Sequence, residues 1–188
     1  MEMSSSNLTS QFLIAMPDLE DANFHHTVTY ICEHTEQGAM GIVLNRPTDI
    51  RLNDILGQLD IDSSTHPQGE QTIYVGGPVQ TDRGFVLHSA EKTWSSTLRV
   101  TERICVTTSI DILEAIAHGL GPAKTMIALG YAGWGGGQLE EELIGNSWLS
   151  SPADDRIIFD LDPDQRWKAA ARLMGVDLDL LSSSPGHA

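Results

Sequence analysis

Hydrophobic and polar positions follow the short period of β-strands over several segments of the chain. An apolar run at 12–16 and an alternating run at 27–32 are predicted as the first two strands. Gly38 then turns the chain into an apolar run at 40–44, so we expect this run to pair with its predecessor as a hairpin. Further strands are predicted at 72–75, 84–88, 97–100, 104–107 and 156–160.

Apolar residues recur at the helical spacing of three and four positions in 48–59, 110–120 and 163–174. The capping pair Thr108 and Asp111 is expected to open the second of these helices. A fourth helix is predicted after the glycine-rich segment at 130–137. Many short strands mixed with about four helices predict a largely antiparallel α+β domain.

The chain is organised around residues 124–149, where an apolar run leads into a glycine-rich segment containing Tyr131 and Trp134. Three glycines at 135–137 then precede the fourth helix. Glycine lets the backbone approach another group closely, and the aromatic side chains add broad apolar faces, so this stretch favours a binding pocket. The acidic residues 140–142 would oppose a bound phosphate at that helix, which argues against a phosphate cradle.

Length and charge restrict the class of protein. The 188 residues, 40% of them apolar, favour one domain over 1–188 with flexible ends at 1–10 and 182–188. The net charge of -15 repels phosphate backbones and anionic membrane surfaces, so neither direct nucleic-acid binding nor membrane binding is expected. No leader sequence and no apolar run of roughly 20 residues is present, which predicts a cytoplasmic protein.

The main candidate site combines polar and aromatic residues at predicted strand ends and glycine turns. Two arginines in such turns, within an acidic protein, would offer bidentate donors to an anion in a cleft. Arginines that pair with carboxylates or cap carbonyl groups are the more common alternative. The predicted ligand-binding residues are Asn45, Arg46, Gly76, Gly77, Arg83, Tyr131 and Trp134.

Cysteine and histidine residues form weaker candidate sites. Zinc spacings such as CxxC or HExxH are absent, so a core thiol beside a surface histidine is the favoured interpretation of this group. Apolar neighbours of Cys32 and Cys105 disfavour a reactive thiol and a structural disulfide. We therefore predict no catalytic residue, no metal and no cofactor. The residues considered as zinc ligands are Cys32, His34, His25, His26 and His88.

Four sequence blocks occur together: FLIAMP at 12–17, YICEHTEQGAMGIVLNRP at 30–47, GGPVQTDRGFVLH at 76–88 and ALGYAGWGGGQLEEEL at 128–143. In this combination the chain resembles the AlgH/YqgE family, a bacterial group without an established activity. The resemblance implies a single cytosolic domain with a small β-barrel-like sheet wrapped by helices. Members are often labelled transcriptional regulators, which names no mechanism. His25 and His26 depart from the family pattern, so no function is assigned to them.

The leading hypothesis is a non-enzymatic regulatory or binding protein of the cytoplasm. Its cleft would take a small anionic molecule or a segment of a protein partner. The alternative is an enzyme of unknown class that uses His88 or Cys32. Direct DNA recognition is the weakest hypothesis, because the chain is acidic and lacks a basic helix.

Overall fold

Strands form most of the framework in the computed structural model, which describes residues 7–62 and 67–182. The predicted flexible ends lie mostly outside these ranges. Within the first of them, Leu8 is buried and its N–H donates to His34 Nδ1 at 3.0 Å, so residues 7–10 pack against the sheet. Among the described residues, no helix is long and apolar enough to cross a membrane.

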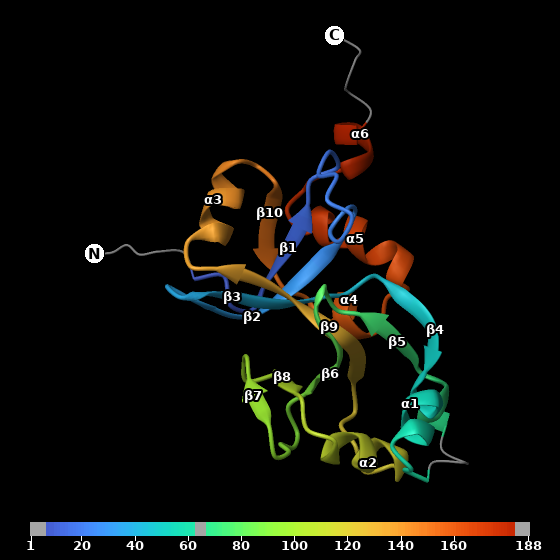
Figure 1. The fold of residues 1–188 in the computed structure, drawn as a ribbon. Coiled ribbons are helices and arrows are strands. Elements are labelled where there is room, and N and C mark those ends of the chain that lie inside the picture. The colour runs from blue at the N-terminus through green and yellow to red at the C-terminus, as the bar shows by residue number, and fades with distance from the viewer. Residues whose placement is uncertain (1–6, 63–66, 183–188) are drawn as a thin grey trace.

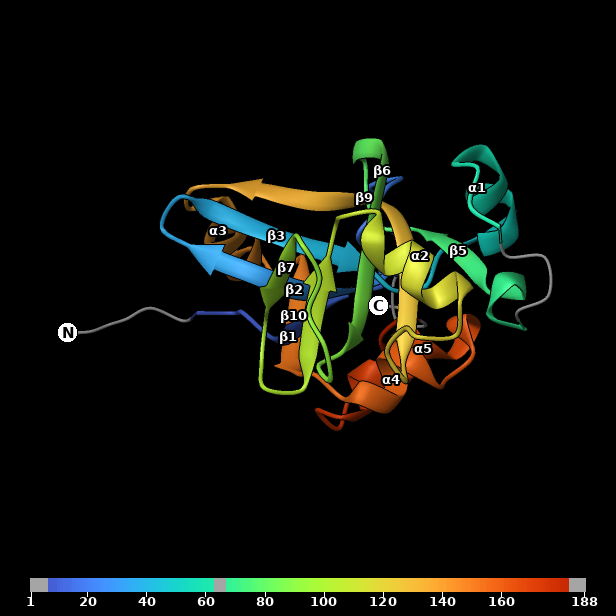
Figure 2. The same ribbon diagram turned by 90° about the horizontal axis from the view of Figure 1, so that it is seen from below.

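The strands form a sheet that curls into an open half-barrel (Figures 1 and 2). Eight of them follow the order β10-β1-β2-β3-β9-β6-β8-β7, and β5 pairs with both β4 and β9. Every pairing is antiparallel except that of β5 with β9. The strands are β1 (Gln11–Ala15), β2 (Val28–Thr35), β3 (Gly38–Val43), β4 (Pro47–Arg51), β5 (Thr72–Val75), β6 (Val79–Ser89), β7 (Thr97–Arg99), β8 (Ile104–Thr107), β9 (Thr125–Gly135) and β10 (Trp148–Pro152).

Helices flank this sheet, which confirms the predicted α+β class. Three of the four predicted helices are shorter than expected, and short helices owe their stability to the apolar face that they bury. The helices are α1 (Leu52–Gln58), α2 (Asp111–Ala117), α3 (Gln138–Ile144), α4 (Asp155–Phe159), α5 (Pro163–Arg172) and α6 (Leu178–Ser182), with a 3-10 turn at Pro67–Glu70.

Two predicted elements are wrong. Residues 156–160 form helix α4 instead of a strand, because the Asp154 carboxylate accepts the Arg156 N–H at 2.9 Å and caps a helix start. Residues 48–51 belong to strand β4, so the helix predicted from 48 begins only at Leu52. The expected capping pair of α2 does not form either, because Ile110 is the N-cap residue of this helix and no side chain caps it; the Thr108 hydroxyl accepts a hydrogen bond from Arg83.

The alternation predicted for the first strands places their side chains in two separate cores. Phe12 and Tyr30 pack with Trp167 of α5, whereas Leu13 and Ile31, on the opposite face, pack with Leu139 of α3. Both faces of this part of the sheet are therefore covered, and each fully buried large side chain contributes roughly 1.5–3 kcal/mol. A third core lies where α1 and α2 pack against β5, β6 and β9, through Leu52, Leu56, Ile112, Ile116, Ile73, Val86 and Ile127.

Strand β9 changes its partner at Gly130. Its first half pairs in parallel with β5 as far as Leu129, and its second half pairs antiparallel with β3 from Ala132 onward. The chain leaving β5 crosses this point at Gly76 and Gly77. A Cβ atom at Gly77 would lie 2.1 Å from the carbonyl carbon of Tyr131, and Gly77 has φ of +155°. Only glycine fits such a crossing.

We expect Gly77→Ala to lower the free energy of unfolding by roughly 3 kcal/mol, because the new methyl group meets backbone atoms that cannot move aside. Gly57→Ala in α1 is the matched control. A Cβ there meets nothing within 4 Å, so the variant should be more stable by about 0.5–1 kcal/mol. Urea unfolding of both variants tests this expectation, and equal stability of the two would contradict it.

Candidate functional site

A cleft of about 920 Å³ lies between the tip of the β2–β3 hairpin and the β7–β8 edge of the half-barrel. Its base is formed by β6 and β9, the strands that connect these two parts (Figure 2). The apolar part of the lining consists of Met40, Val79, Phe85, Leu98, Val106 and Tyr131, and Arg83 and Glu33 are its charged members. We call this the Arg83 cleft.

Arg83 is positioned by two neutral acceptors. Its Nη1 donates to Gln80 Oε1 at 3.2 Å, and its Nη2 donates to Thr108 Oγ1 at 3.1 Å. The guanidinium carbon lies 5.6 Å from the centre of the Phe85 ring, and Phe85 in turn packs edge-on against Tyr131 at 5.5 Å. No described carboxylate forms an ion pair with Arg83. A cation next to two aromatic rings is thus presented to the cleft.

Trp134 forms part of the cleft wall but is mainly a core residue, only 6% exposed. Its ring stacks on Phe24 at 5.9 Å and meets Trp148 edge-on at 6.0 Å. Both indole N–H groups donate to the same oxygen, Glu142 Oε1, at 3.1 and 2.9 Å. This arrangement fixes Trp134 in one orientation.

Asn45 and Arg46 are not among the residues that line the Arg83 cleft. Arg46 donates to the carbonyl groups of Ala22 and His25, at 2.9 and 3.0 Å. Asn45 accepts the Val28 N–H at 3.0 Å and donates to the carbonyl of His26 at 2.9 Å. Their side chains hold the loop between β1 and β2, which is the structural role that arginines in turns commonly take.

The two glycines predicted for the site do not line the cleft, but they contact a strand that does. Gly76 and Gly77 lie against the backbone of Gly130 and Tyr131 and so determine where the Tyr131 side chain emerges. Of the seven predicted residues, the structure therefore brings three together in one cleft: Arg83, Tyr131 and Trp134.

Most of the other residues that line the Arg83 cleft were not predicted from the sequence. They include short polar side chains at 95–97 on the β7–β8 side and Thr35 and residues 37–40 on the hairpin side. Serine, threonine and glutamine in turns are ordinary surface residues, so only the curl of the sheet identifies them as neighbours of Arg83.

The histidines considered as ligands or bases have structural partners. His34 accepts the Leu8 N–H through Nδ1, so its Nε2–H donates to Glu140 Oε2 at 3.0 Å. His25 and His26 stack with ring centres 3.7 Å apart, and His26 stacks on Trp167 at 4.1 Å. Within the described ranges, no group of three His, Cys, Asp or Glu residues is arranged to hold a metal ion.

The groups named for the enzymatic alternative are buried. Burial raises the pKa of both the Cys32 and the Cys105 thiols, which disfavours the nucleophilic thiolate. His88 is fully buried, with Nδ1 donating to the Ser89 carbonyl and Nε2 accepting from the Thr107 hydroxyl, each at 2.7 Å. Neither Cys32 nor His88 lines the Arg83 cleft.

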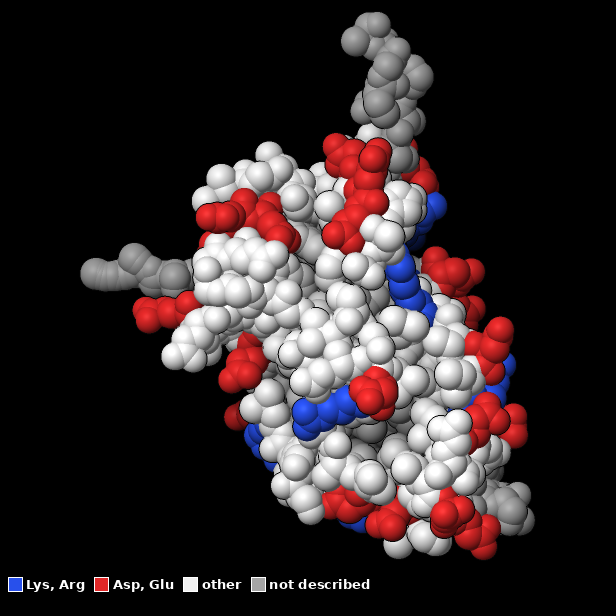
Figure 3. Space-filling model, in the orientation of Figure 1, with Lys and Arg blue, Asp and Glu red and all other residues white. Residues whose placement is uncertain are grey.

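The surface carries the acidic character expected from the sequence. Figure 3 shows Asp and Glu side chains in several groups over one face, with few Lys and Arg side chains among them. Some of the described cations are in local ion pairs, such as Arg103 with Asp155 and Lys168 with Asp179. Such pairs contribute little to stability at a surface. Arg83, like Arg51 and Lys92, has uncharged partners instead.

Comparison with known proteins gives consistent similarities. A family model described as AlgH-like matches residues 12–179. A UPF0301 protein of Thioalkalivibrio sulfidiphilus is 60% identical over 185 residues, 98% of this chain and 99% of its own length. The solution structure of the AlgH protein from Pseudomonas aeruginosa has 53% identity and a TM-score of 0.80, with full coverage of both chains. A crystal structure from Corynebacterium diphtheriae, 22% identical, shares the fold with a TM-score of 0.75 over 97% of this chain and 95% of that one.

The burial of His88 predicts a pH dependence of stability. Burial lowers the pKa of His88 below the value of about 6.5 that it has when unfolded, so the unfolded chain binds the proton more readily. Stability from this group is present above about pH 6.5 and falls as the pH drops through the lower folded pKa, by at most about 1.4 kcal/mol per pH unit.

Urea unfolding at pH 7.5 and 5.5, pH values chosen to span about 6.5, measures this loss. His88→Gln should show a smaller loss of stability on acidification. The lowered pKa of His26, caused mainly by burial and then by His25, acts in the same direction and persists in that variant. His118→Gln, at an exposed position of the chain, is the control for removal of a histidine. Equal pH slopes for wild type and His88→Gln would contradict the expectation.

Proposed function

The chain belongs to the AlgH-like family, and on that basis we propose that it is a non-enzymatic, cytoplasmic binding protein with a regulatory role. In this proposal, the Arg83 cleft holds an extended segment of a partner protein. A carboxylate of that segment would pair with Arg83, and its apolar side chains would lie on Phe85 and Tyr131.

The observation that carries the proposal is the environment of Arg83. Its guanidinium group is oriented by two neutral oxygens and forms no ion pair with a described carboxylate. A hydrogen bond between such a group and a carboxylate is worth roughly 1.5–3 kcal/mol, more than a bond between neutral groups. The chain as a whole carries a net charge of -15, so this cation lies within an acidic protein.

The shape of the cleft supports a segment over a small molecule. A volume of about 920 Å³ lies at the upper end for small-molecule pockets, and the cleft is open along its length between two parts of one sheet. Strand β7 ends the order of described strands, so its outer edge offers backbone groups to an added strand. A small anionic molecule at Arg83 remains the second candidate, because it needs the same cation and only part of the cleft.

A regulatory role would then act through protein binding. The net charge of -15 opposes contact with a phosphate backbone at long range, which supports regulation without direct DNA binding. The raised pKa values of both buried thiols and the buried position of His88 also support a binding role over catalysis.

Selection of peptides from a random display library against the intact protein tests the proposal. We expect selected peptides to combine an acidic residue with apolar residues at alternate positions. Arg83→Gln should weaken their binding at least about tenfold, which corresponds to roughly 1.4 kcal/mol. Arg172→Gln removes one positive charge from an exposed position in the last turn of α5 and is the matched control.

Three results separate the alternatives. Peptides that bind wild type and Arg83→Gln equally would overturn the proposed cleft. A library without binders, together with binding of a small carboxylate or phosphate that depends on Arg83, would favour the small-molecule candidate. A salt-sensitive, saturable complex with duplex DNA would favour direct nucleic-acid recognition.

A further inference from the structure

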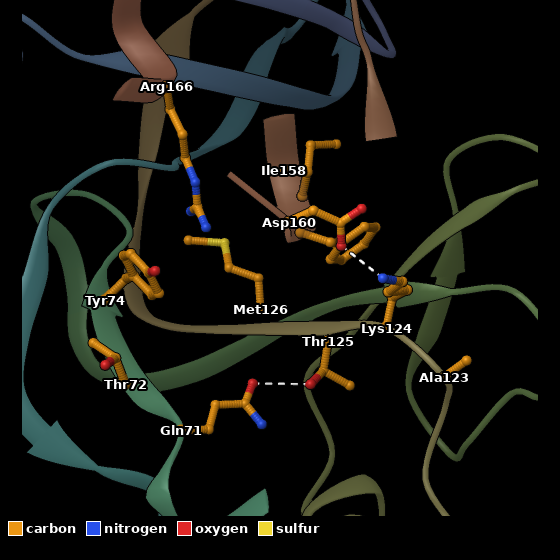
Figure 4. Close-up of a pocket in the computed structure, with 11 residues that line it drawn as sticks. Gln71, Thr72, Tyr74, Ala123, Lys124, Thr125, Met126, Ile158, Asp160 and Arg166 are labelled. Atoms are coloured by element: carbon orange, nitrogen blue, oxygen red, sulfur yellow. Dashed lines mark hydrogen bonds and ion pairs between the residues drawn. The ribbon is translucent and has the colours of Figure 1, made fainter. Parts of the chain in front are cut away.

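A second cavity, separate from the Arg83 cleft in its lining residues, contains a buried cation. This cavity of about 350 Å³ lies among β5, the start of β9, the end of α4 and the first turns of α5 (Figure 4). Arg166 of α5 extends into it between Met126 and Tyr74. Only 4% of Arg166 is exposed, an unusual burial for an arginine.

Two hydrogen bonds of Arg166 use part of its donor capacity, and both go to neutral main-chain carbonyl groups. Nε donates to the Leu161 carbonyl at 2.9 Å, and Nη1 donates to the Leu44 carbonyl at 2.6 Å. These bonds use two of the five N–H donors of a guanidinium group. The Tyr74 ring centre lies 5.1 Å from the guanidinium carbon, and no described Asp or Glu forms an ion pair with Arg166.

The charged residues that line the cavity sum to one net positive charge. Lys124 and Asp160 are the other charged lining residues, and they neutralise each other through an ion pair of 2.6 Å between Nζ and Oδ1. Burial of this ion is costly and lowers the pKa of Arg166, whereas the Tyr74 side chain and the nearby Asp162 and Asp160 act in the opposite direction and offset part of the cost. An anion bound beside Arg166 would remove this penalty.

We propose that this cavity binds a small carboxylic acid as its monoanion, with the carboxylate at Arg166. A single negative charge matches the net charge of the lining, whereas a phosphate dianion would bring a second charge toward Asp160. Met126, Ile158 and Phe159 supply an apolar wall for a short hydrocarbon or aromatic body. Thr72 and Thr125 line the polar side of the cavity. The planar guanidinium group suits bidentate contact with a carboxylate.

The site differs from the usual structural arginine by its cavity. Arg46 also donates to two main-chain carbonyls, but it is only half-buried and lines neither this cavity nor the Arg83 cleft. Arg166 connects α5 to the segment after β3 through Leu44 and, at the same time, lines a cavity large enough for a small ligand.

Nuclear magnetic resonance titration of the intact protein with sodium benzoate, sodium butyrate, phosphate and chloride at constant ionic strength tests the proposal. Benzoate and butyrate should give saturable shifts of the Met126 methyl and the Arg166 Nε–H signals. Phosphate should bind more weakly than either carboxylate, and chloride should give no saturable shift. Tighter binding of phosphate, or absence of saturable shifts with both carboxylates, would overturn the proposal.

Two substitutions have opposite expected effects. Arg166→Gln should weaken benzoate binding ~10-fold or more, because it removes the charge and the fork of donors. Asp160→Asn should tighten binding by ~3- to 10-fold, since it removes a negative charge from the lining while leaving Arg166 and its hydrogen bonds in place. Asp155→Asn is the matched control: it removes the same charge from the first residue of α4, the helix that Asp160 follows, at an ion pair with Arg103 outside this cavity, and should leave binding unchanged.

If Arg166→Gln does not fold, the comparison of Asp160→Asn with Asp155→Asn decides the matter. Unchanged or weaker benzoate binding in Asp160→Asn would contradict the proposed site. Arg83→Gln should retain wild-type benzoate binding, because Arg83 does not line this cavity. If the Arg83 cleft does not bind a partner, the proposal for this second site is therefore unaffected. Loss of benzoate binding in Arg83→Gln would overturn the proposed carboxylate site at Arg166.

Discussion

The fold depends on one close crossing of main chains, where Gly76 and Gly77 pass the backbone of Gly130 and Tyr131. A strand has two edges, and β9 uses one of them for β5 and then for β3 within a few residues. That exchange requires β5 to leave the sheet without a gap, and side chains at the crossing would hold the two backbones apart. The absence of side chains there lets the sheet continue while it curls, and the curl brings the hairpin tip over the β7–β8 edge.

Both candidate sites follow from this curl. In the Arg83 cleft, residues from the first third of the chain face residues from the β6–β8 region across the concave side of the half-barrel. On the other side of the exchange, β5 and β9 run in parallel, and α4 and α5 close a smaller cavity around Arg166. Each candidate site of this acidic protein thus contains an arginine that is oriented by neutral oxygens.

Local patterns predicted most elements, because alternation and capping reflect contacts close in sequence. Residues 156–160 misled the prediction since two adjacent isoleucines resemble a strand, and only the capping by Asp154 distinguishes the helix. The site was less predictable: Arg83 and Tyr131 meet through the curl of the sheet, while Arg46 serves a loop. The sequence contained one indication of the Arg166 site: this charged residue lies on the buried face of α5, next to Trp167 and four residues before Ala170.

The carboxylate of Glu142 has a consequence for how the Arg83 cleft adapts to an occupant. One oxygen holds the indole N–H groups of both Trp134 and Trp148, so Trp134 cannot rotate without leaving a buried donor unsatisfied. That wall of the cleft is preorganised and would incur little entropic loss when a ligand binds. The opposite wall, at residues 95–97, is also held by hydrogen bonds. The Ser95 and Ser96 N–H groups donate to Asp111 Oδ2 and Ser109 Oγ, at 2.9 and 3.0 Å, and the Thr97 and Thr107 hydroxyls lie 2.8 Å apart. Both of these walls are therefore held in place before any occupant binds.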